Sequence, residues 1–175
     1  MRKVKLFIAS SLDGYIARKD DSIDWLYTDG DYGFAQFYDS VDTILMGRRT
    51  YEKAIELAAG GYPYKDKKSY VFTQTASGRK REKDQNVHFI ANVIEFAKEL
   101  IHSPGKDIWL VGGADIISIF LNAGLLDEII LSIHPIILGN GIPLFKNLQG
   151  QTNLNLIKSI PYENGLMQLY YKYIS

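Results

Sequence analysis

The chain has 175 residues, of which 46% are hydrophobic, 20 are basic and 20 are acidic, and it contains no cysteine. This length and apolar content suit a single domain over residues 1–175. The zero formal net charge argues against a nucleic-acid or membrane-surface binder, and the missing cysteines exclude disulfides, cysteine metal sites and thiol nucleophiles. Because no apolar run approaches the roughly 20 residues of a membrane span, we expect a cytoplasmic protein without a membrane or nucleic-acid partner.

Short apolar segments rich in β-branched and aromatic residues recur along the chain, as expected of strands in a buried parallel sheet. The predicted strands cover residues 4–9, 43–46, 69–73, 87–90, 108–111, 128–134, 153–160 and 167–174. Patterns typical of helices cover residues 32–40, 49–59, 92–102 and 114–123. Because strands alternate with helices, right-handed crossovers and a mostly parallel α/β sheet are predicted.

The alternation ends at Glu128, after which only strand patterns follow. Residues 162–165 read Tyr-Glu-Asn-Gly, and Asn-Gly is the most characteristic dipeptide of a tight hairpin. We therefore expect the last strand to run antiparallel to its neighbour, so that the sheet ends in a hairpin.

Several familiar catalytic and nucleotide-binding motifs are absent. The sequence contains neither G-x-G-x-x-G nor G-x-x-x-x-G-K-[ST], and it has no G-x-S-x-G. The three histidines, His88, His102 and His134, have no metal-ligand partner at short helical spacing. A zinc hydrolase and a hydrolase triad are therefore not expected, and no metal site is predicted.

Two glycine turns stand where a predicted strand passes into a predicted helix, at residues 47–50 (GRRT) and residues 111–114 (VGGA). Glycine lets a ligand approach the backbone, a helix start offers unpaired N–H groups, and arginine suits phosphate. Each turn by itself is equally compatible with a simple strand–helix connection. Because both lie at the carboxyl ends of predicted parallel strands, together they favour a dinucleotide site.

A third polar segment begins where another strand is expected to end, at residues 73–75 (TQT), and continues through residues 77–83. Its hydroxyl groups, with Arg79, Lys80 and Arg81, could receive a 2′-phosphate, which would favour NADPH over NADH. The alternative is that this basic run is only a solvated loop.

Four ordered segments resemble the dihydrofolate reductase-like superfamily: IASSLDGYIA at 8–17, SIDWL at 22–26, DTILMGRRTY at 42–51 and IWLVGG at 108–113. Two further stretches, LDE at 126–128 and HPIILGNGIPLF at 134–145, resemble the reductase domain at the C-terminal end of the bifunctional riboflavin-biosynthesis deaminase–reductase. The resemblance covers essentially the whole chain. It implies a three-layer α/β fold with a central eight-stranded, mostly parallel sheet, an antiparallel C-terminal strand and flanking helices.

The resemblance also implies that NADPH binds in an extended pose across the strand ends. The residues that would contact its nicotinamide are Ala9, Ser10 and Ile16. Those that would hold its diphosphate, 2′-phosphate and adenosine ribose are Gly47, Arg48, Arg49, Thr50, Thr73 and Gln74. At the second turn, the residues that would bracket the diphosphate and the nicotinamide are Gly112, Gly113, Ala114 and Asp115. Asp115 departs from the basic residue common at its position, and an acid beside a diphosphate is unfavourable unless it points away or caps the helix.

Hydride transfer from a cofactor needs at most one proton source from the protein, so a single carboxylate in an apolar pocket suffices. Asp31 is the candidate, because it lies 16 residues before Gly47, as the substrate-anchoring acid of dihydrofolate reductases does. Burial would raise the pKa of this carboxyl group. By the same resemblance Ser132 would be its hydroxyl partner, and Trp25 and Phe34 would contact the substrate ring. The alternative is that Asp31 only begins a helix.

The expected function is an NADPH-dependent reductase of a pteridine- or pyrimidine-type small molecule, with the riboflavin branch favoured by residues 135–145. The stretch D-x-P-x-L-T-x-R that normally follows the glycine turn in that branch is absent, and residues 49–52 (RTYE) are closer to dihydrofolate reductase. A true dihydrofolate reductase and a non-catalytic, nucleotide-binding dimeric module are the alternatives. The tyrosine-rich residues 170–173 could cover a subunit interface, and a homodimer is expected. If Asp31 is not the acid of the site, the other candidates for that role are Asp13, Asp24 and Glu128.

Overall fold

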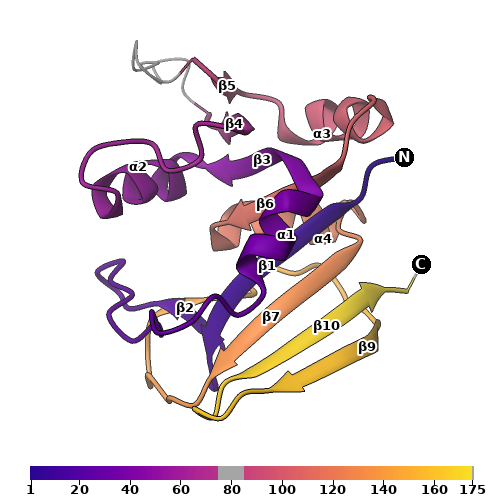
Figure 1. Cartoon of the computed structure of the whole chain (residues 1–175). Coiled ribbons are helices and arrows are strands. Elements are labelled where there is room, and N and C mark those ends of the chain that lie inside the picture. The colour runs from indigo at the N-terminus through magenta and orange to yellow at the C-terminus, as the bar shows by residue number, and fades with distance from the viewer. Residues whose placement is uncertain (75–84, 175) are drawn as a thin grey trace.

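The computed structural model describes residues 1–74 and 85–174. The strands of its main sheet are, in chain order, β1 (Val4–Ser11), β3 (Val41–Gly47), β4 (Lys68–Phe72), β5 (Val87–Ile90), β6 (Asp107–Gly112), β7 (Glu128–His134), β9 (Leu154–Pro161) and β10 (Met167–Tyr173). Within the described residues these eight strands lie side by side in the order β5-β4-β3-β6-β1-β7-β10-β9 (Figure 1). Strands β1 and β3 to β7 pair in parallel, whereas β10 runs antiparallel to both of its neighbours. The predicted mostly parallel α/β sheet with an antiparallel C-terminal strand is confirmed.

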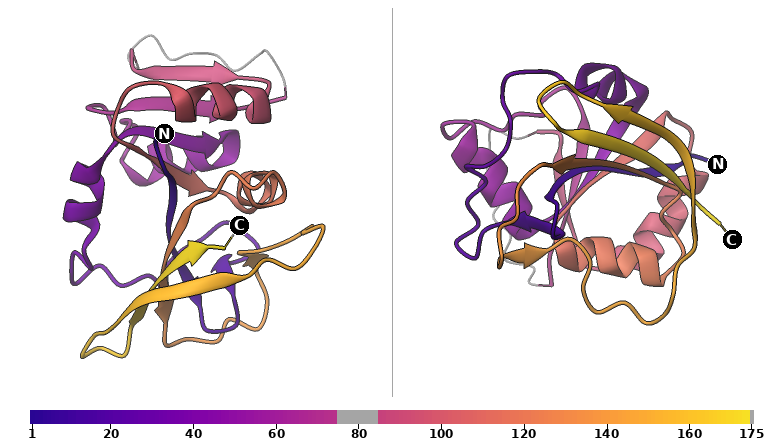
Figure 2. Two further views of the ribbon diagram at one scale, coloured as in Figure 1. Left: turned by 90° about the vertical axis from the view of Figure 1, so that its right-hand side faces the viewer. Right: turned by 90° about the horizontal axis from the view of Figure 1, so that it is seen from below.

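Helices cover both faces of this sheet. They are α1 (Phe34–Ser40), α2 (Arg48–Leu57), α3 (Val93–His102) and α4 (Ala114–Asn122). On β6, Trp109 belongs to the buried cluster under α1 and α2, while its neighbour Leu110 belongs to the cluster under α3 and α4. Figure 2 shows α1 on one side of the sheet and α3 and α4 on the other. None of the helices in the described ranges is long and apolar enough to cross a membrane.

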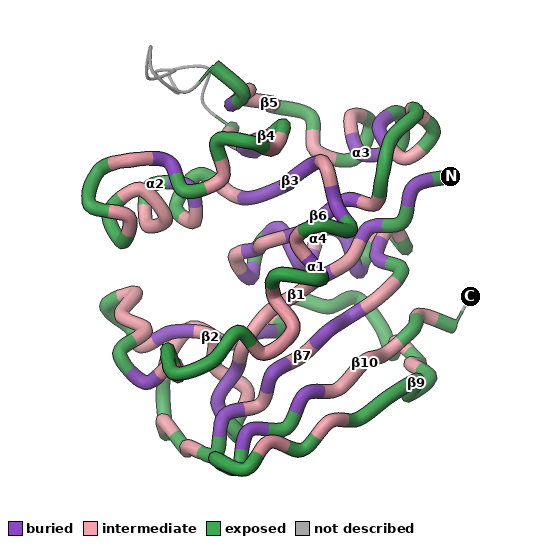
Figure 3. Tube along the Cα trace, in the orientation of Figure 1, coloured by how far each residue is buried: buried purple, intermediate pink, exposed green. Residues whose placement is uncertain are grey.

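Burial follows the position of each strand in the sheet (Figure 3). Strands β3 and β4 are buried along most of their length, because side chains of the helices pack on both of their faces. Their near-continuous apolar sequences reflect this double burial. Strand β9 lies at the edge of the sheet and is exposed along most of its length. The core therefore lies on both sides of the parallel strands, including β3 and β6, whose carboxyl ends carry the glycine turns.

The hairpin at the end of the chain forms as predicted. The Tyr162 N–H group donates to the Leu166 carbonyl oxygen at 2.9 Å, and Gly165 adopts a φ of 87°. Glycine reaches such a positive φ without steric cost, which explains why the Asn-Gly dipeptide marks this turn.

Two features differ from the sequence-based prediction. A small two-stranded ribbon of β2 (Tyr15–Ala17) and β8 (Ile142–Pro143) was not predicted, because two or three residues are too few to show a period. Helix α1 begins at Phe34 and not at residue 32, because Tyr32 and Gly33 have left-handed φ values of 49° and 77°.

Candidate functional site

The two glycine turns lie side by side at one edge of the sheet. Strands β3 and β6 are direct neighbours, and Met46 pairs with Gly112 at their carboxyl ends. A Cβ atom placed on Gly47 would lie 3.8 Å from the Gly112 carbonyl oxygen and 4.0 Å from the Gly113 nitrogen. Segments more than 60 residues apart in the sequence therefore meet at one place, as the sequence analysis predicts.

Each glycine turn leads directly into a helix at the carboxyl end of its strand. Gly47 is the N-cap residue of α2 and Gly113 is the N-cap residue of α4, and neither helix has a side-chain capping hydrogen bond. A Cβ atom on Gly113 would lie 3.4 Å from the Thr50 hydroxyl oxygen, so the second turn faces the first turn of α2. Two helix starts without side-chain caps form a suitable environment for an anion such as a diphosphate.

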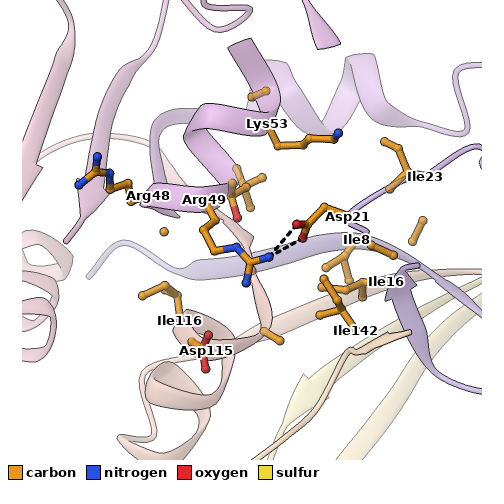
Figure 4. A pocket seen from close by; sticks show the side chains of 18 of the residues that line it. Ile8, Ile16, Asp21, Ile23, Arg48, Arg49, Lys53, Asp115, Ile116 and Ile142 are labelled. Atoms are coloured by element: carbon orange, nitrogen blue, oxygen red, sulfur yellow. Dashed lines mark hydrogen bonds and ion pairs between the residues drawn. The ribbon is translucent and has the colours of Figure 1, made fainter. Parts of the chain in front are cut away.

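A cavity of about 840 Å³ opens at this edge of the sheet. Figure 4 shows part of its lining, with Arg49 reaching from α2 to Asp21 on the segment between β2 and α1. The predicted cofactor and substrate residues that line the cavity are Ala9, Ile16, Phe34, Gly47, Arg48, Arg49, Thr50, Thr73, Gln74, Gly113, Ala114 and Asp115. The structure thus brings most of the predicted binding residues together, while their roles stay predictions.

Some predicted residues lie outside this lining or outside the described part of the chain. Ser10 is buried in β1, and neither Ser10 nor Gly112 lines the cavity. The basic run that includes Arg79, Lys80 and Arg81 lies outside the described residues.

The cavity lining carries more positive than negative charge among the described residues. Its cations are Arg48, Arg49, Lys53 and Lys146, and its carboxylates are Asp21 and Asp115. Arg48 and Arg49 occupy the first turn of α2, where the helix dipole disfavours cations. Cations at such a position, beside a cavity, are expected where an anionic ligand binds.

Ion pairs explain how the unexpected acid at the second turn is accommodated. The Asp115 carboxylate lies 2.7 Å from the Lys146 ammonium group, so its charge is neutralised at the cavity surface. The Arg49 guanidinium holds the Asp21 carboxylate through contacts of 2.7 and 2.9 Å. Sequence reasoning missed Asp21 and Lys146, because each pairs with a residue about thirty positions away along the chain and no local pattern links them.

Asp31 does not have the buried environment that was expected for it. The residue is exposed and does not line the cavity. Its carboxylate accepts a hydrogen bond from the Ala35 N–H group at 3.0 Å, and its carbonyl oxygen accepts one from the Phe34 N–H group at 2.9 Å. The expected burial of Asp31 is therefore wrong, and its observed contacts are those of a residue that holds the start of a helix.

Ser132 belongs to a buried polar group beside the cavity and does not line it. Its hydroxyl oxygen accepts a hydrogen bond from the side-chain amide of Gln168 at 3.0 Å. The same Gln168 nitrogen donates to the Tyr32 carbonyl oxygen at 2.9 Å. Gln168 is fully buried, so this group anchors the chain before α1 to strands β7 and β10. Sequence reasoning missed Gln168, because a single polar residue in a strand carries no motif.

Trp25 and Phe34 differ in their relation to the cavity. Phe34 lines it and packs edge-on against Trp109, with ring centroids 5.4 Å apart. Trp25 is buried against His134, with centroids 5.2 Å apart, and does not line the cavity.

Burial lowers the pKa of His134, which accepts a hydrogen bond from the Tyr27 N–H group. His134 is thus a core residue, and no group of possible metal ligands occurs in residues 1–74 and 85–174.

The other candidate acids have structural partners and do not line the cavity. Hydrogen bonds from the Ser11 hydroxyl and from backbone amides lower the pKa of Asp13. The Arg18 guanidinium lowers the pKa of Asp24, and Glu128 pairs with Lys3 at 2.7 Å.

Comparison with known proteins identifies the relatives of this chain. The family model of the RibD C-terminal domain matches residues 64–168. The uncharacterized protein YwjB of Bacillus subtilis (strain 168) is 40% identical over 174 residues, which cover 97% of each protein. A solved structure of a "Putative riboflavin biosynthesis protein" from Shewanella sp. PV-4 is 30% identical over 99% of both chains, with a TM-score of 0.89. A dihydrofolate reductase from Enterococcus faecalis, complexed with NADP(H), is 14% identical over 99% of this chain and 97% of that chain, with a TM-score of 0.73.

The sheet order, the flanking helices and the structural comparison define a protein with the dihydrofolate reductase-like α/β fold. Within that class, the chain belongs to the RibD C-terminal domain family. Both steps confirm the resemblance found in the sequence.

Proposed function

We propose that this protein is an NADPH-dependent oxidoreductase that reduces a pteridine- or pyrimidine-type small molecule, similar to the reductase of riboflavin biosynthesis. The observation that carries the proposal is the meeting of two glycine turns and two uncapped helix starts on one cavity with an excess of cations. Family membership and the NADP(H) complex of the structurally similar dihydrofolate reductase support it.

The residues present fit a dinucleotide phosphate. Glycine at positions 47 and 113 leaves room beside the backbone, and the first amides of α2 and α4 would donate hydrogen bonds to the diphosphate. Arg48 would hold the 2′-phosphate, while Ala9 and Ile16 would pack against the nicotinamide. A reduced nicotinamide, when bound, supplies a hydride. The chain itself then has to bind and orient the two reactants and to exclude water from them.

A titration with NADPH tests this proposal. We expect saturable quenching of tryptophan fluorescence, because Trp109 lines the cavity whereas Trp25 is buried outside its lining. The quenching should disappear in Trp109→Phe and persist in Trp25→Phe. A wild-type chain whose fluorescence is unchanged by NADPH would contradict the proposal.

Turnover assays with different substrates distinguish the alternative functions. Steady oxidation of NADPH with dihydrofolate favours a true dihydrofolate reductase, and oxidation with a ribosylaminopyrimidine favours the riboflavin branch. Binding without turnover of any pteridine, pyrimidine or small carbonyl compound favours the non-catalytic nucleotide-binding module. The homodimer and the cytoplasmic location stay predictions.

The placement of Asp31 leads to a prediction that distinguishes its two interpretations. Asn keeps an oxygen that can accept the Ala35 amide, so Asp31→Asn is expected to change turnover by no more than about twofold, as for an ordinary exposed substitution. The rate of NADPH oxidation with the best substrate measures this. A tenfold loss with unchanged NADPH affinity would instead return Asp31 to the site as its proton-carrying acid.

A further inference from the structure

Four of the aromatic residues that line the cavity, Phe7, Phe34, Tyr64 and Trp109, pack against one another, and we call them the aromatic wall. Their rings form one continuous series. The centroid distances are 5.7 Å from Phe7 to Phe34, 5.4 Å from Phe34 to Trp109 and 5.2 Å from Trp109 to Tyr64. Aromatic faces and edges at such spacings favour a flat ring as the ligand.

The aromatic wall carries one hydroxyl group, that of Tyr64. The indole N–H of Trp109 already donates to the Phe7 carbonyl oxygen at 3.4 Å. In the described residues no hydrogen bond from the Tyr64 hydroxyl is found, whereas the nearby Tyr62 hydroxyl donates to the Ser69 oxygen at 2.7 Å. Burial raises the pKa of Tyr64, so its phenol is protonated at neutral pH and is able to donate.

The charged side chains of the described lining are already engaged in ion pairs. Their ion pairs are Arg48–Glu52, Arg49–Asp21, Lys53–Glu56 and Lys146–Asp115. None of these side chains belongs to the aromatic wall. A ring bound there would therefore meet aromatic surface and one hydroxyl group, and a charged ring would lose its hydration without gaining a counter-charge.

We propose that the aromatic wall binds a flat, uncharged ring that carries a ketone oxygen, and that the Tyr64 hydroxyl donates its proton to that oxygen. This inference rests on the proposed function, because the reduction needs the hydride of a reduced nicotinamide cofactor. The carbonyl carbon gains the hydride in a new C–H bond, and the π electron pair moves to the oxygen. The oxygen takes the phenolic proton of Tyr64, which water then restores. The ketone becomes a secondary alcohol and the cofactor becomes oxidised.

Isatin, a flat and uncharged ring ketone, is a suitable probe, with its ring-sulfonated derivative as the anionic counterpart. We expect the wild-type chain to oxidise NADPH in the presence of isatin and to bind the sulfonated derivative about tenfold more weakly. Tyr64→Phe should lower kcat with isatin about a hundredfold, the usual loss on removing a positioned acid. It should also weaken the binding of isatin to the NADP⁺-loaded chain about fivefold, through the lost hydrogen bond.

Tyr62→Phe is the matched control, because it removes a hydroxyl from a neighbouring ring whose hydrogen bond lies outside the cavity lining. It should retain kcat and isatin affinity. Equal kcat in wild type and Tyr64→Phe would overturn the role of Tyr64, and isatin that neither binds nor reacts would overturn the substrate class. NADPH binding is measured separately by fluorescence, so its absence in wild type marks a failure of the proposed function itself.

Discussion

Valine in place of Gly113 is expected to weaken NADPH binding about a hundredfold, which corresponds to a steric cost of about 3 kcal/mol. The protein itself has room for the first carbon of the new side chain, because among the described residues a Cβ atom on Gly113 meets the Thr50 hydroxyl oxygen alone, at 3.4 Å. The two methyl groups of valine would extend from there into the space between the glycine turns. If the diphosphate lies in that space, it has to compete with them.

Two further variants make this result interpretable. Gly113→Ala adds only the Cβ atom and should weaken binding less than valine does. Gly150→Val serves as the control, because Gly150 does not line the cavity and a Cβ atom there has open space around it. The NADPH dissociation constant is measured by fluorescence and folding by thermal unfolding. A folded Gly113→Val variant that binds NADPH as well as wild type would show that the ligand does not approach this backbone.

The fold was predictable where the physical signal is local. Strands β3 and β4 are buried along most of their length, which explains the apolar runs at residues 44–46 and 70–72. The Asn-Gly dipeptide specifies the hairpin before β10 through the positive φ of Gly165. The β2–β8 ribbon depends on a pairing between segments about 125 residues apart. Such a contact leaves no period in the sequence of either partner.

The candidate site likewise contains features that the sequence predicts and features that it does not. The meeting of Gly47 and Gly113 could be expected, because the carboxyl ends of parallel strands share one edge of a sheet. The exposure of Asp31 could not be predicted from its spacing to Gly47, because a count of residues does not reveal the left-handed conformations of Tyr32 and Gly33. Tyr64 was also missed, because it lies in the connection between α2 and β4, where no periodic pattern distinguishes a cavity-lining residue from an exposed one.

Arg48→Ala is expected to weaken NADPH binding about tenfold while changing NADH binding by no more than about twofold. The two cofactors differ only in the 2′-phosphate, so a selective loss locates the residue that holds this group. Arg49 is engaged by both carboxylate oxygens of Asp21, and Arg48 pairs through its Nε atom with Glu52 of the same helix at 2.8 Å. Figure 4 shows the Arg48 guanidinium pointing away from the Arg49–Asp21 pair.

Arg18→Ala is the matched control for the loss of one positive charge. Arg18 pairs with Asp24 at 2.6 Å and does not line the cavity, so its removal should affect both cofactors equally and weakly. Arg48→Lys keeps the charge but loses the planar fork of donors, so its NADPH affinity should fall between those of wild type and Arg48→Ala. Dissociation constants for NADPH and NADH, measured at one ionic strength, decide whether Arg48 holds the 2′-phosphate. Equal losses of NADPH and NADH in Arg48→Ala would place Arg48 at the diphosphate, which both cofactors share.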